Sequence, residues 1–281
     1  MKSLVRLGIV LAIVLFGLIT YCSNTSGNLL TGENQHVQLS AQQEIFLGRR
    51  AKRQMAAQYG GLHPDTLLQQ YVSQVGQQVV ARSSASKTPY PFEFHLLHDT
   101  QTINAVALPG GQVFLTVALL KRLTSEAQLA AVLGHEVGHV VARHGAEHLA
   151  KQSFSPILGT AIDAAAKATE KSEQQEEALK QAINQLVSLR YGRDDELEGD
   201  RLGLRFMTEA GYDPQGIVQL MQMLSAARQN SQPAAFFSTH PSPDNRVKRL
   251  QTLITQTYPQ GTPRSLKDNR ETFAQIVQTR L

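Results

Sequence analysis

Two histidines and one glutamate near the middle of the chain have the spacing of a metal-binding helix. His135, Glu136 and His139 form the pattern H-E-x-x-H inside an apolar, alanine-rich stretch. Residues four apart on a helix differ by about 40° around its axis, so His135 and His139 can bind one ion together. Glu136 lies about 100° from His135, where its carboxylate can reach a water molecule on that ion. The pattern predicts a catalytic zinc with Glu136 as general base.

Two further histidines follow on the same predicted helix. Counted at about 100° per residue, His144 and His148 lie roughly 180° and 220° from His135. We therefore expect them to point away from the metal, as polar or capping side chains near the helix end. The longer pattern H-E-x-x-H-x-x-G-x-x-H would need a histidine where the chain has Gly145, so the metzincin class is excluded.

The third zinc ligand must come from another segment, because a catalytic zinc has three protein ligands and one open position. The acidic stretch RYGRDDELEGDRLG reads as a helix after Gly192. Glu196 and Asp200 are four residues apart and share a face of that helix. One carboxylate would bind zinc, and the other would accept the free ring N–H of a ligand histidine. We predict Glu196 as the ligand and Asp200 as the hydrogen-bonding partner, with Glu198 as the alternative ligand.

Helical periodicity and capping signals predict the elements that position these residues. Ser40 and Gln43 form a capping box that opens a helix over residues 40–59. A second amphipathic helix is expected at 66–82. Residues 153–172 fit either a packed helix or a mobile flap. Further helices are predicted at 126–152, within 174–189, and at 194–210, 215–228 and 243–257.

Short strands are expected between the second helix and the metal-binding helix. Phe92, Phe94 and Leu96 alternate along one stretch, which is the period of a strand. Residues 104–116 read as two more strands around the turn at 109–111. The fold class is therefore α+β and mainly α. We expect a zincin-like helical domain with an antiparallel or mixed sheet of about three strands beside the active-site helix.

Composition excludes two broad classes of protein. The chain has 281 residues, of which 42% are hydrophobic, so it can bury a core and is not disordered. Its net charge is +4, but the basic residues are scattered and the chain has no tryptophan. These features argue against a nucleic-acid partner.

The N-terminus predicts export. Lys2 and Arg6 precede an apolar run at 7–19, so residues 1–24 read as a signal peptide or signal anchor. Cys22 lies where a bacterial lipoprotein carries its lipid, although Tyr21 before it disfavours lipidation. With one cysteine, no intramolecular disulfide can form.

Four motifs together resemble a known peptidase family. They are NAVALPGG, LGHEVGHVVARHGAE, RYGRDDELEGDRLG and STHPSPDNRVKRL. They resemble the gluzincin metallopeptidases that include HtpX and the CaaX prenyl proteases, closest to the exported BepA and LoiP type. The resemblance covers about residues 40–253. It implies a zinc endopeptidase with His135, His139 and Glu196 as ligands, Glu136 as base and Asp200 as orienting residue.

The resemblance also suggests roles outside the zinc motif. The stretch from Asn104 and Ala105 resembles an active-site edge strand whose backbone would pair with an extended substrate. His240 would either stabilise the tetrahedral oxyanion or occupy the open zinc position in a resting state. Arg246 is expected to anchor the loop that carries His240.

Two glycines depart from the family pattern. Gly192 stands where the family usually has serine, and Gly199 stands where it has alanine. Gly199 should weaken its helix by up to about 1 kcal/mol relative to alanine, unless close helix packing requires glycine.

The predicted protein is an exported zinc endopeptidase, periplasmic or otherwise extracytoplasmic and attached to the membrane through its N-terminal segment. We expect one Zn²⁺ per chain, and extended or unfolded polypeptide as substrate. The resemblance implies misfolded or unassembled envelope proteins. The alternative is a zinc-stabilised envelope chaperone or assembly factor with little proteolysis, although a purely structural zinc site would need no base such as Glu136. The predicted domains are a linker at 25–39, a zinc metallopeptidase domain at 40–258 and a polar segment at 259–281.

Overall fold

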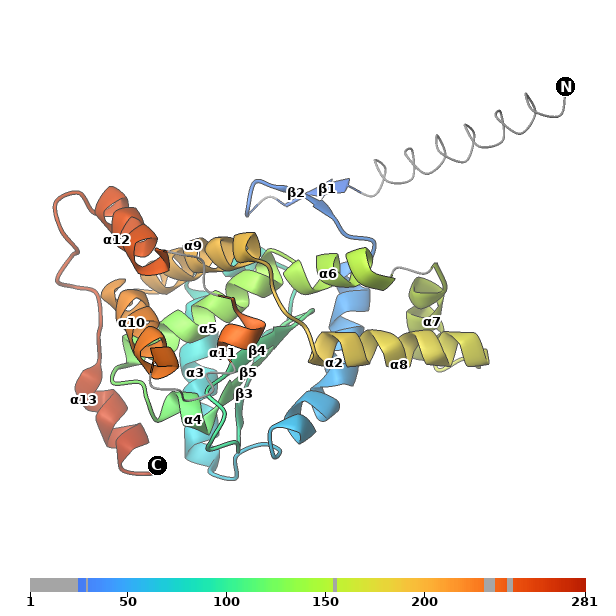
Figure 1. The fold of residues 1–281 in the computed structure, drawn as a ribbon, viewed down its shortest axis with the longest axis horizontal. Coiled ribbons are helices and arrows are strands. Elements are labelled where there is room, and N and C mark those ends of the chain that lie inside the picture. Colours follow the sequence, from blue (N-terminus) through green and yellow to red (C-terminus); the bar gives the residue numbers. More distant parts are fainter. Residues whose placement is uncertain (1–24, 29, 154–155, 230–235, 242–244) are drawn as a thin grey trace, which may run out of the picture.

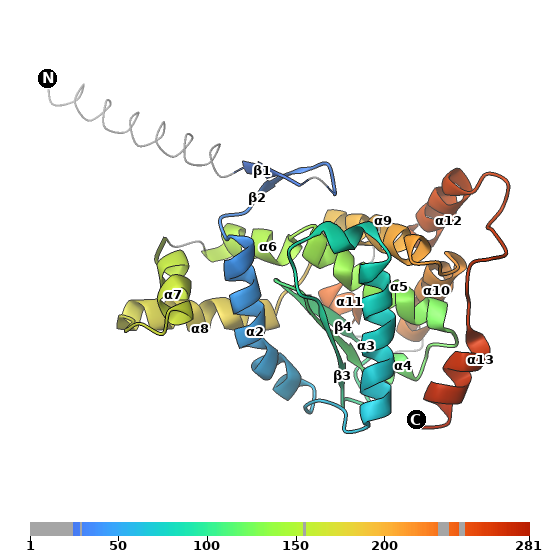
Figure 2. The same cartoon turned by 180° about the vertical axis from the view of Figure 1, so that it is seen from behind.

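A small mixed sheet forms the middle of the fold, with helices against both faces (Figures 1 and 2). The computed structural model describes residues 25–28, 30–153, 156–229, 236–241 and 245–281. The sheet contains β3 (Glu93–Leu97), β4 (Ala105–Leu108) and β5 (Gln112–Thr116) in the order β3-β5-β4. β3 is parallel to β5, and β4 is antiparallel to it. The predicted three-stranded sheet is confirmed as a mixed one, and β4 forms one edge.

Helices make up most of the described chain, which confirms the mainly helical α+β class. They are α2 (Ala41–Gln58), α3 (Thr66–Ala81), α4 (Val117–Leu120), α5 (Glu126–Val141), α6 (His144–Ser153), α7 (Pro156–Ala166), α8 (Glu173–Val187), α9 (Arg193–Glu209), α10 (Gln215–Gln229), α11 (Phe236–Thr239), α12 (Arg246–Thr257) and α13 (Arg270–Phe273). A 3₁₀ turn at Ser84–Lys87 and a π turn at Ala274–Gln278 complete the helical elements.

The two faces of the sheet belong to two apolar cores. Phe94, Leu96 and Val113 lie in a core shared with α3 and α5, as the strand alternation predicted. Val106 and Phe114 lie in a second core with α2, α6, α7 and α8. The sheet therefore links the buried helix α5 to the outer layer of helices.

Local sequence sets where the helices begin. Ser40 caps α2 by accepting a hydrogen bond from the Gln43 N–H, and the Gln43 side chain accepts one from the Ser40 N–H. This is the predicted capping box. Residues 156–166, inside the stretch that sequence left open, form α7, and Leu158 and Ile162 are buried there.

The single helix expected at 126–152 is wrong, because the chain turns between α5 and α6. Arg143 adopts a left-handed conformation with φ 58°, which a continuous right-handed helix does not allow. Its guanidinium donates to the Leu39 carbonyl and to the buried Glu44 carboxylate. We call residues 142–143 the elbow. These contacts with the N-terminal part of the chain favour the turn over another helical residue.

The stretch predicted as a linker, 25–39, contains a small hairpin. β1 (Thr25–Gly27) pairs antiparallel with β2 (Asn34–His36). The Asn28 amide donates to the Val141 carbonyl at 2.7 Å, and the Gln35 amide donates to the Ala142 carbonyl. Carbonyls at the last turn of a helix have no partner within the helix, so the hairpin supplies hydrogen bonds at the end of α5.

The C-terminal segment packs into the same core as α5. Phe273 and Val277 are buried, and Asn269 donates to the Glu126 carboxylate at 3.0 Å. Glu126 also accepts hydrogen bonds from the hydroxyls of Tyr71 and Tyr212. The first turn of α5 is thus tied to three other parts of the chain.

No helix among the described residues is both long enough and apolar enough to cross a membrane. The predicted signal peptide or anchor at 1–24, with Cys22, lies outside the described residues.

The helices α5 and α9 approach each other so closely that glycines line their contact. A Cβ atom at Gly134 would lie 3.1 Å from the Gly203 carbonyl oxygen, and one at Gly138 would lie 3.1 Å from the Gly199 carbonyl oxygen. A Cβ at Gly199 would lie 3.0 Å from the His135 ring. Close packing therefore accounts for glycine at position 199, as the sequence argument allowed.

Replacing Gly203 with alanine tests this contact. The new Cβ would lie 2.8 Å from the His135 backbone nitrogen, so the helices must separate. We expect a loss of about 1–3 kcal/mol in the free energy of unfolding, measured by urea titration, although alanine favours a helix. Gly159→Ala in α7 is the control, since its nearest atom would be at 3.7 Å and its stability should not fall. Equal stability of Gly203→Ala and wild type would contradict the close contact.

Candidate metal centre and active site

Four side chains from three parts of the chain converge on one buried point. His135 and His139 come from α5, Glu196 comes from α9, and His240 follows α11. The two Nε2 atoms of His135 and His139 are 3.0 Å apart, and each lies 3.5 Å from an oxygen of Glu196. His240 Nδ1 is 2.9 Å from Glu196 Oε1. One ligand atom from each of the four residues lies within 4.8 Å of the others.

This geometry suits a zinc ion. Tetrahedral zinc with bonds of about 2.0–2.1 Å places neighbouring ligand atoms roughly 3.3 Å apart. Burial lowers the pKa of His135, but hydrogen bonds to Asp200 and Glu196 overcome this and raise that pKa to about 9. Burial and the neighbouring His135 lower the pKa of His139 well below its usual value. The surroundings thus favour a cation between the histidines and the carboxylate, and a neutral His139.

Glu136 points into the same space without a hydrogen-bond partner in the described chain. The side chain is 0% exposed, and neither carboxylate oxygen accepts a hydrogen bond from any described residue. Its Oε1 lies 3.6 Å from His240 Nε2. Burial raises the pKa of Glu136, which makes its carboxylate a stronger proton acceptor once it is ionised.

Asp200 and Arg246 lie behind the histidine on the α9 side. Asp200 Oδ1 is 3.2 Å from His135 Nδ1, the ring nitrogen that faces away from the cluster. Arg246 donates through Nη2 to Asp200 Oδ1 at 2.7 Å, and its Nη1 lies 3.0 Å from Glu196 Oε2. The guanidinium of Arg246 is buried and contacts both carboxylates. Arg246 therefore contacts the site itself, whereas the sequence predicted only that it anchors a loop. Sequence gave no signal for this pairing.

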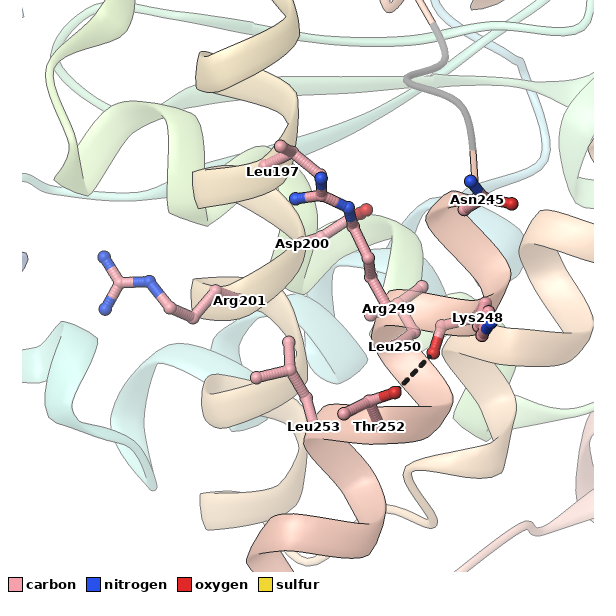
Figure 3. A pocket seen from close by; sticks show the side chains of 9 residues that line it. All are labelled: Leu197, Asp200, Arg201, Asn245, Lys248, Arg249, Leu250, Thr252 and Leu253. Carbon is pink, nitrogen blue, oxygen red and sulfur yellow. Dashed lines mark hydrogen bonds between the residues drawn. The ribbon is translucent and has the colours of Figure 1, made fainter.

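Asp200 also lines a pocket between α9 and α12, which Figure 3 shows from close by. The pocket has a volume of about 380 Å³ and includes Arg201, Lys248 and Arg249. None of the four clustered residues lines it. Glu136 does not line it either.

A known protein family matches the part of the chain that contains this site. Residues 66–254 match peptidase family M48, a span that contains the whole cluster. The chain belongs to peptidase family M48.

Relatives extend the M48 match over most of the chain. The chain is 32% identical to the beta-barrel assembly-enhancing protease of Yersinia pestis over 239 residues, covering 83% of this chain and 48% of that protein. It is 32% identical to the protein of the same name from Escherichia coli K12 over 227 residues, covering 79% and 46%. The mitochondrial metalloendopeptidase OMA1 of Schizosaccharomyces pombe is 32% identical over 219 residues, covering 76% and 61%. This M48 chain spans about half the length of the first two relatives.

The outer edge of β4 in this M48 chain is occupied by side chains from the site. The Ala105 carbonyl lies 3.1 Å from His240 Nε2, and the Ala107 carbonyl accepts a hydrogen bond from the Tyr191 hydroxyl at 3.1 Å. The Asn104 amide donates to the Tyr59 hydroxyl at 2.9 Å. The positions expected to contact substrate therefore lie beside the cluster, with their polar groups already bonded within the chain.

Sequence reasoning missed Tyr191. Its ring stacks on His139 with the centroids 3.8 Å apart and the planes at 8°. It is the second residue of the stretch RYGRDDELEGDRLG, and nothing in its spacing indicates that it reaches back to α5.

His144 lies outside the metal-binding group, as expected, but it is not merely a polar or capping side chain, because it contacts His139. The elbow ends α5, so the angular count along a single helix does not reach α6. His144 is 2% exposed, and its Nδ1 lies 2.8 Å from His139 Nδ1. Glu198, the alternative ligand, is 3.1 Å from His144 Nε2 and is not part of the cluster. His148 does point away from the cluster and pairs with Asp195 at 2.7 Å.

The elbow rests on an ion pair between Arg143 and Glu44. Burial outweighs the attraction of Arg143 and raises the pKa of Glu44 to about 7. The carboxylate is fully buried, and Tyr90 also donates to it at 3.1 Å. Because this pKa is raised from 4.5, the fold loses stability as the pH rises through about 7, and above that pH the pair is ionised.

At pH 8 we expect Glu44→Ala to lower the free energy of unfolding by about 3 kcal/mol, because it leaves a half-buried guanidinium without its carboxylate. Urea unfolding measures the change. Glu93→Ala is the matched control. Glu93 pairs with Lys52, which lies on α2 as Glu44 does, but the Glu93 side chain is 39% exposed. That control should cost no more than about 1 kcal/mol. Equal losses would contradict a special role for the elbow.

Proposed function

We propose that this chain is a zinc-dependent endopeptidase that cleaves misfolded or unassembled cell-envelope proteins. The observation that supports this best is the convergence of His135, His139 and Glu196 on one point. The carboxylate of Glu136, which accepts no hydrogen bond from any described residue, lies beside it. A site that only stabilised the fold would have no use for Glu136. One Zn²⁺ per chain would be held by these three ligands.

Zinc bound there would supply Lewis-acid chemistry, acidifying a water molecule and polarising the scissile carbonyl. Glu136 would take the proton of the attacking water on a carboxylate oxygen and deliver it to the leaving amine nitrogen. Asp200 would accept the Nδ1 hydrogen of His135, which leaves Nε2 free to bind the metal. Arg246 would hold Glu196 Oε2, so that Oε1 faces the metal.

The substrate would be an extended polypeptide paired with the β4 edge. Adding a strand there uses backbone groups of Ala105 and the residues beside it, with Asn104 at the start of the strand. His240 and Tyr191 now hold the outward carbonyls of that edge, so a substrate must displace them. This requirement favours unfolded chains that can enter as a single strand.

His240 would occupy the fourth metal position in the resting enzyme. Its Nδ1 lies among the ligand atoms, and its Nε2 is bonded to the edge strand. A substrate that pairs with β4 would therefore release the residue that blocks the metal. The alternative role, oxyanion stabilisation, would need His240 to stay in place during the reaction.

We further propose that the enzyme works outside the cytoplasm, attached to the membrane through residues 1–24. The apolar run in the sequence supports this, and so does the name of the two bacterial relatives, beta-barrel assembly-enhancing protease.

Metal content tests the ligand set. Glu196→Ala should fail to retain zinc at a concentration that loads one ion per wild-type chain, as measured by mass spectrometry after gel filtration. Glu198→Ala should still load one ion at saturating zinc, because Glu198 lies outside the cluster. The reverse pattern would make Glu198 the ligand and overturn the proposed centre.

Unfolded-protein cleavage tests the chemistry. Glu136→Gln should keep its zinc but lose at least about 100-fold in rate, because the proton acceptor is gone. His240→Ala should cleave at least as fast as wild type if His240 blocks the metal, and much more slowly if it stabilises the oxyanion. Zinc in all variants with cleavage in none, including wild type and His240→Ala, would favour a non-proteolytic assembly factor.

A further inference from the structure

His144 connects a proposed zinc ligand to a carboxylate on another helix. It begins α6, directly after the elbow, and its ring is buried beneath His139. Its Nδ1 lies 2.8 Å from His139 Nδ1, and its Nε2 lies 3.1 Å from Glu198 Oε2. Both ring nitrogens of His144 are therefore used within the protein.

The positions of the hydrogens follow from the proposed metal site, on which this inference rests. If His139 binds zinc through Nε2, its ring hydrogen must be on Nδ1. The atom 2.8 Å away is His144 Nδ1, which must then accept that hydrogen. A neutral His144 carries its own hydrogen on Nε2, where the Glu198 carboxylate accepts it. One arrangement of hydrogens satisfies every contact.

We propose that Glu198 and His144 form a relay of two hydrogen bonds that orients His139 for zinc binding. In this relay His144 and Glu198 are positioning residues, because neither reaches the metal. His135 contacts its carboxylate directly, without an intermediate histidine, since its Nδ1 lies 3.2 Å from Asp200 Oδ1. The two ligand histidines would thus be held by different carboxylates of α9.

The geometry of α9 explains why one histidine needs an intermediary. Glu196 and Asp200 are four residues apart and face α5, whereas Glu198 lies about 200° around the helix from Glu196. Glu198 therefore faces α6 and is too far around to reach His139 itself. The elbow turns the chain so that His144 lies between His139 and Glu198. Arg201 Nη2 donates to the other oxygen of Glu198 at 2.9 Å, which holds that carboxylate from the far side.

Tyr191 restrains the same ligand in a different way. Its ring stacks on His139 at a centroid distance of 3.8 Å, which fixes the plane of the imidazole. A hydrogen bond at Nδ1 fixes the rotation of the ring within that plane. Stacking alone would leave Nε2 free to turn away from the metal, so the relay supplies the restraint that stacking lacks.

Zinc affinity and histidine tautomers test the relay in the full-length zinc-loaded protein. His144→Phe keeps a ring but removes the acceptor, so zinc affinity measured by chelator competition should fall about 10–100-fold. His144→Gln, whose side-chain oxygen can accept the same hydrogen, should recover most of the loss. His148→Phe is the matched control, since His148 lies on α6 and pairs with α9 but does not touch a ligand; its zinc affinity should not change.

A double-mutant cycle separates the relay from simple packing. Glu198→Ala should weaken zinc binding in the wild-type background and have no further effect in His144→Phe. Nitrogen-15 spectra of the histidines should show hydrogen on Nδ1 of His139 and on Nε2 of His144. Unchanged zinc affinity in both His144→Phe and Glu198→Ala, equal losses in His148→Phe, or the opposite tautomer of His144 would overturn the relay.

Different results would contradict the proposed zinc ligands and the proposed relay. If Glu196→Ala keeps its zinc, the proposed centre is wrong. If Glu196→Ala loses zinc while His144→Phe and Glu198→Ala bind it as tightly as wild type, the centre stands and the relay is wrong. If His144→Phe does not fold, Glu198→Ala and the tautomer of wild-type His144 still decide, because neither depends on that variant.

Discussion

The close contact between α5 and α9 is the constraint on which the site depends. Two of the three histidines of the cluster, His135 and His139, lie on α5, and the glutamate that faces them lies on α9, about sixty residues later in the chain. Glycines at 134, 138, 199 and 203 let the two backbones approach each other closely. A Cβ atom at any of these positions would lie within 3.1 Å of an atom of the facing helix. Larger residues would move Glu196 away from the histidines. A rigid pair of helices holds the ligand atoms in place more accurately than loops would.

Segments outside the zinc motif hold both ends of α5. At its start, Glu126 accepts hydrogen bonds from Tyr71, Tyr212 and the C-terminal Asn269. At its end, Asn28 and Gln35 from the N-terminal hairpin donate to the last carbonyls. Since α5 is buried along its whole length, these polar ends need such partners. The stretches before and after the expected catalytic domain are therefore part of its support.

The edge strand and the cluster share side chains. His240 touches both Glu196 and the Ala105 carbonyl, and Tyr191 touches both His139 and the Ala107 carbonyl. A change at the strand edge therefore reaches Glu196 and His139 through two direct contacts. Every residue of the cluster is at most 1% exposed, so access of a substrate requires the chain to open at these contacts.

Sequence by itself determined the parts that depend on local periodicity. The spacing of His135 and His139, the pairing of Glu196 with Asp200, the capping box at Ser40 and the strand alternation at Phe94 are properties of single helices and strands. The mainly helical α+β class followed from them. Tertiary structure alone decided the elbow, because Arg143 takes its left-handed conformation beside a glutamate almost a hundred residues earlier. It likewise brought His144, Tyr191 and Arg246 to the site, since contacts between distant segments leave no period in the sequence.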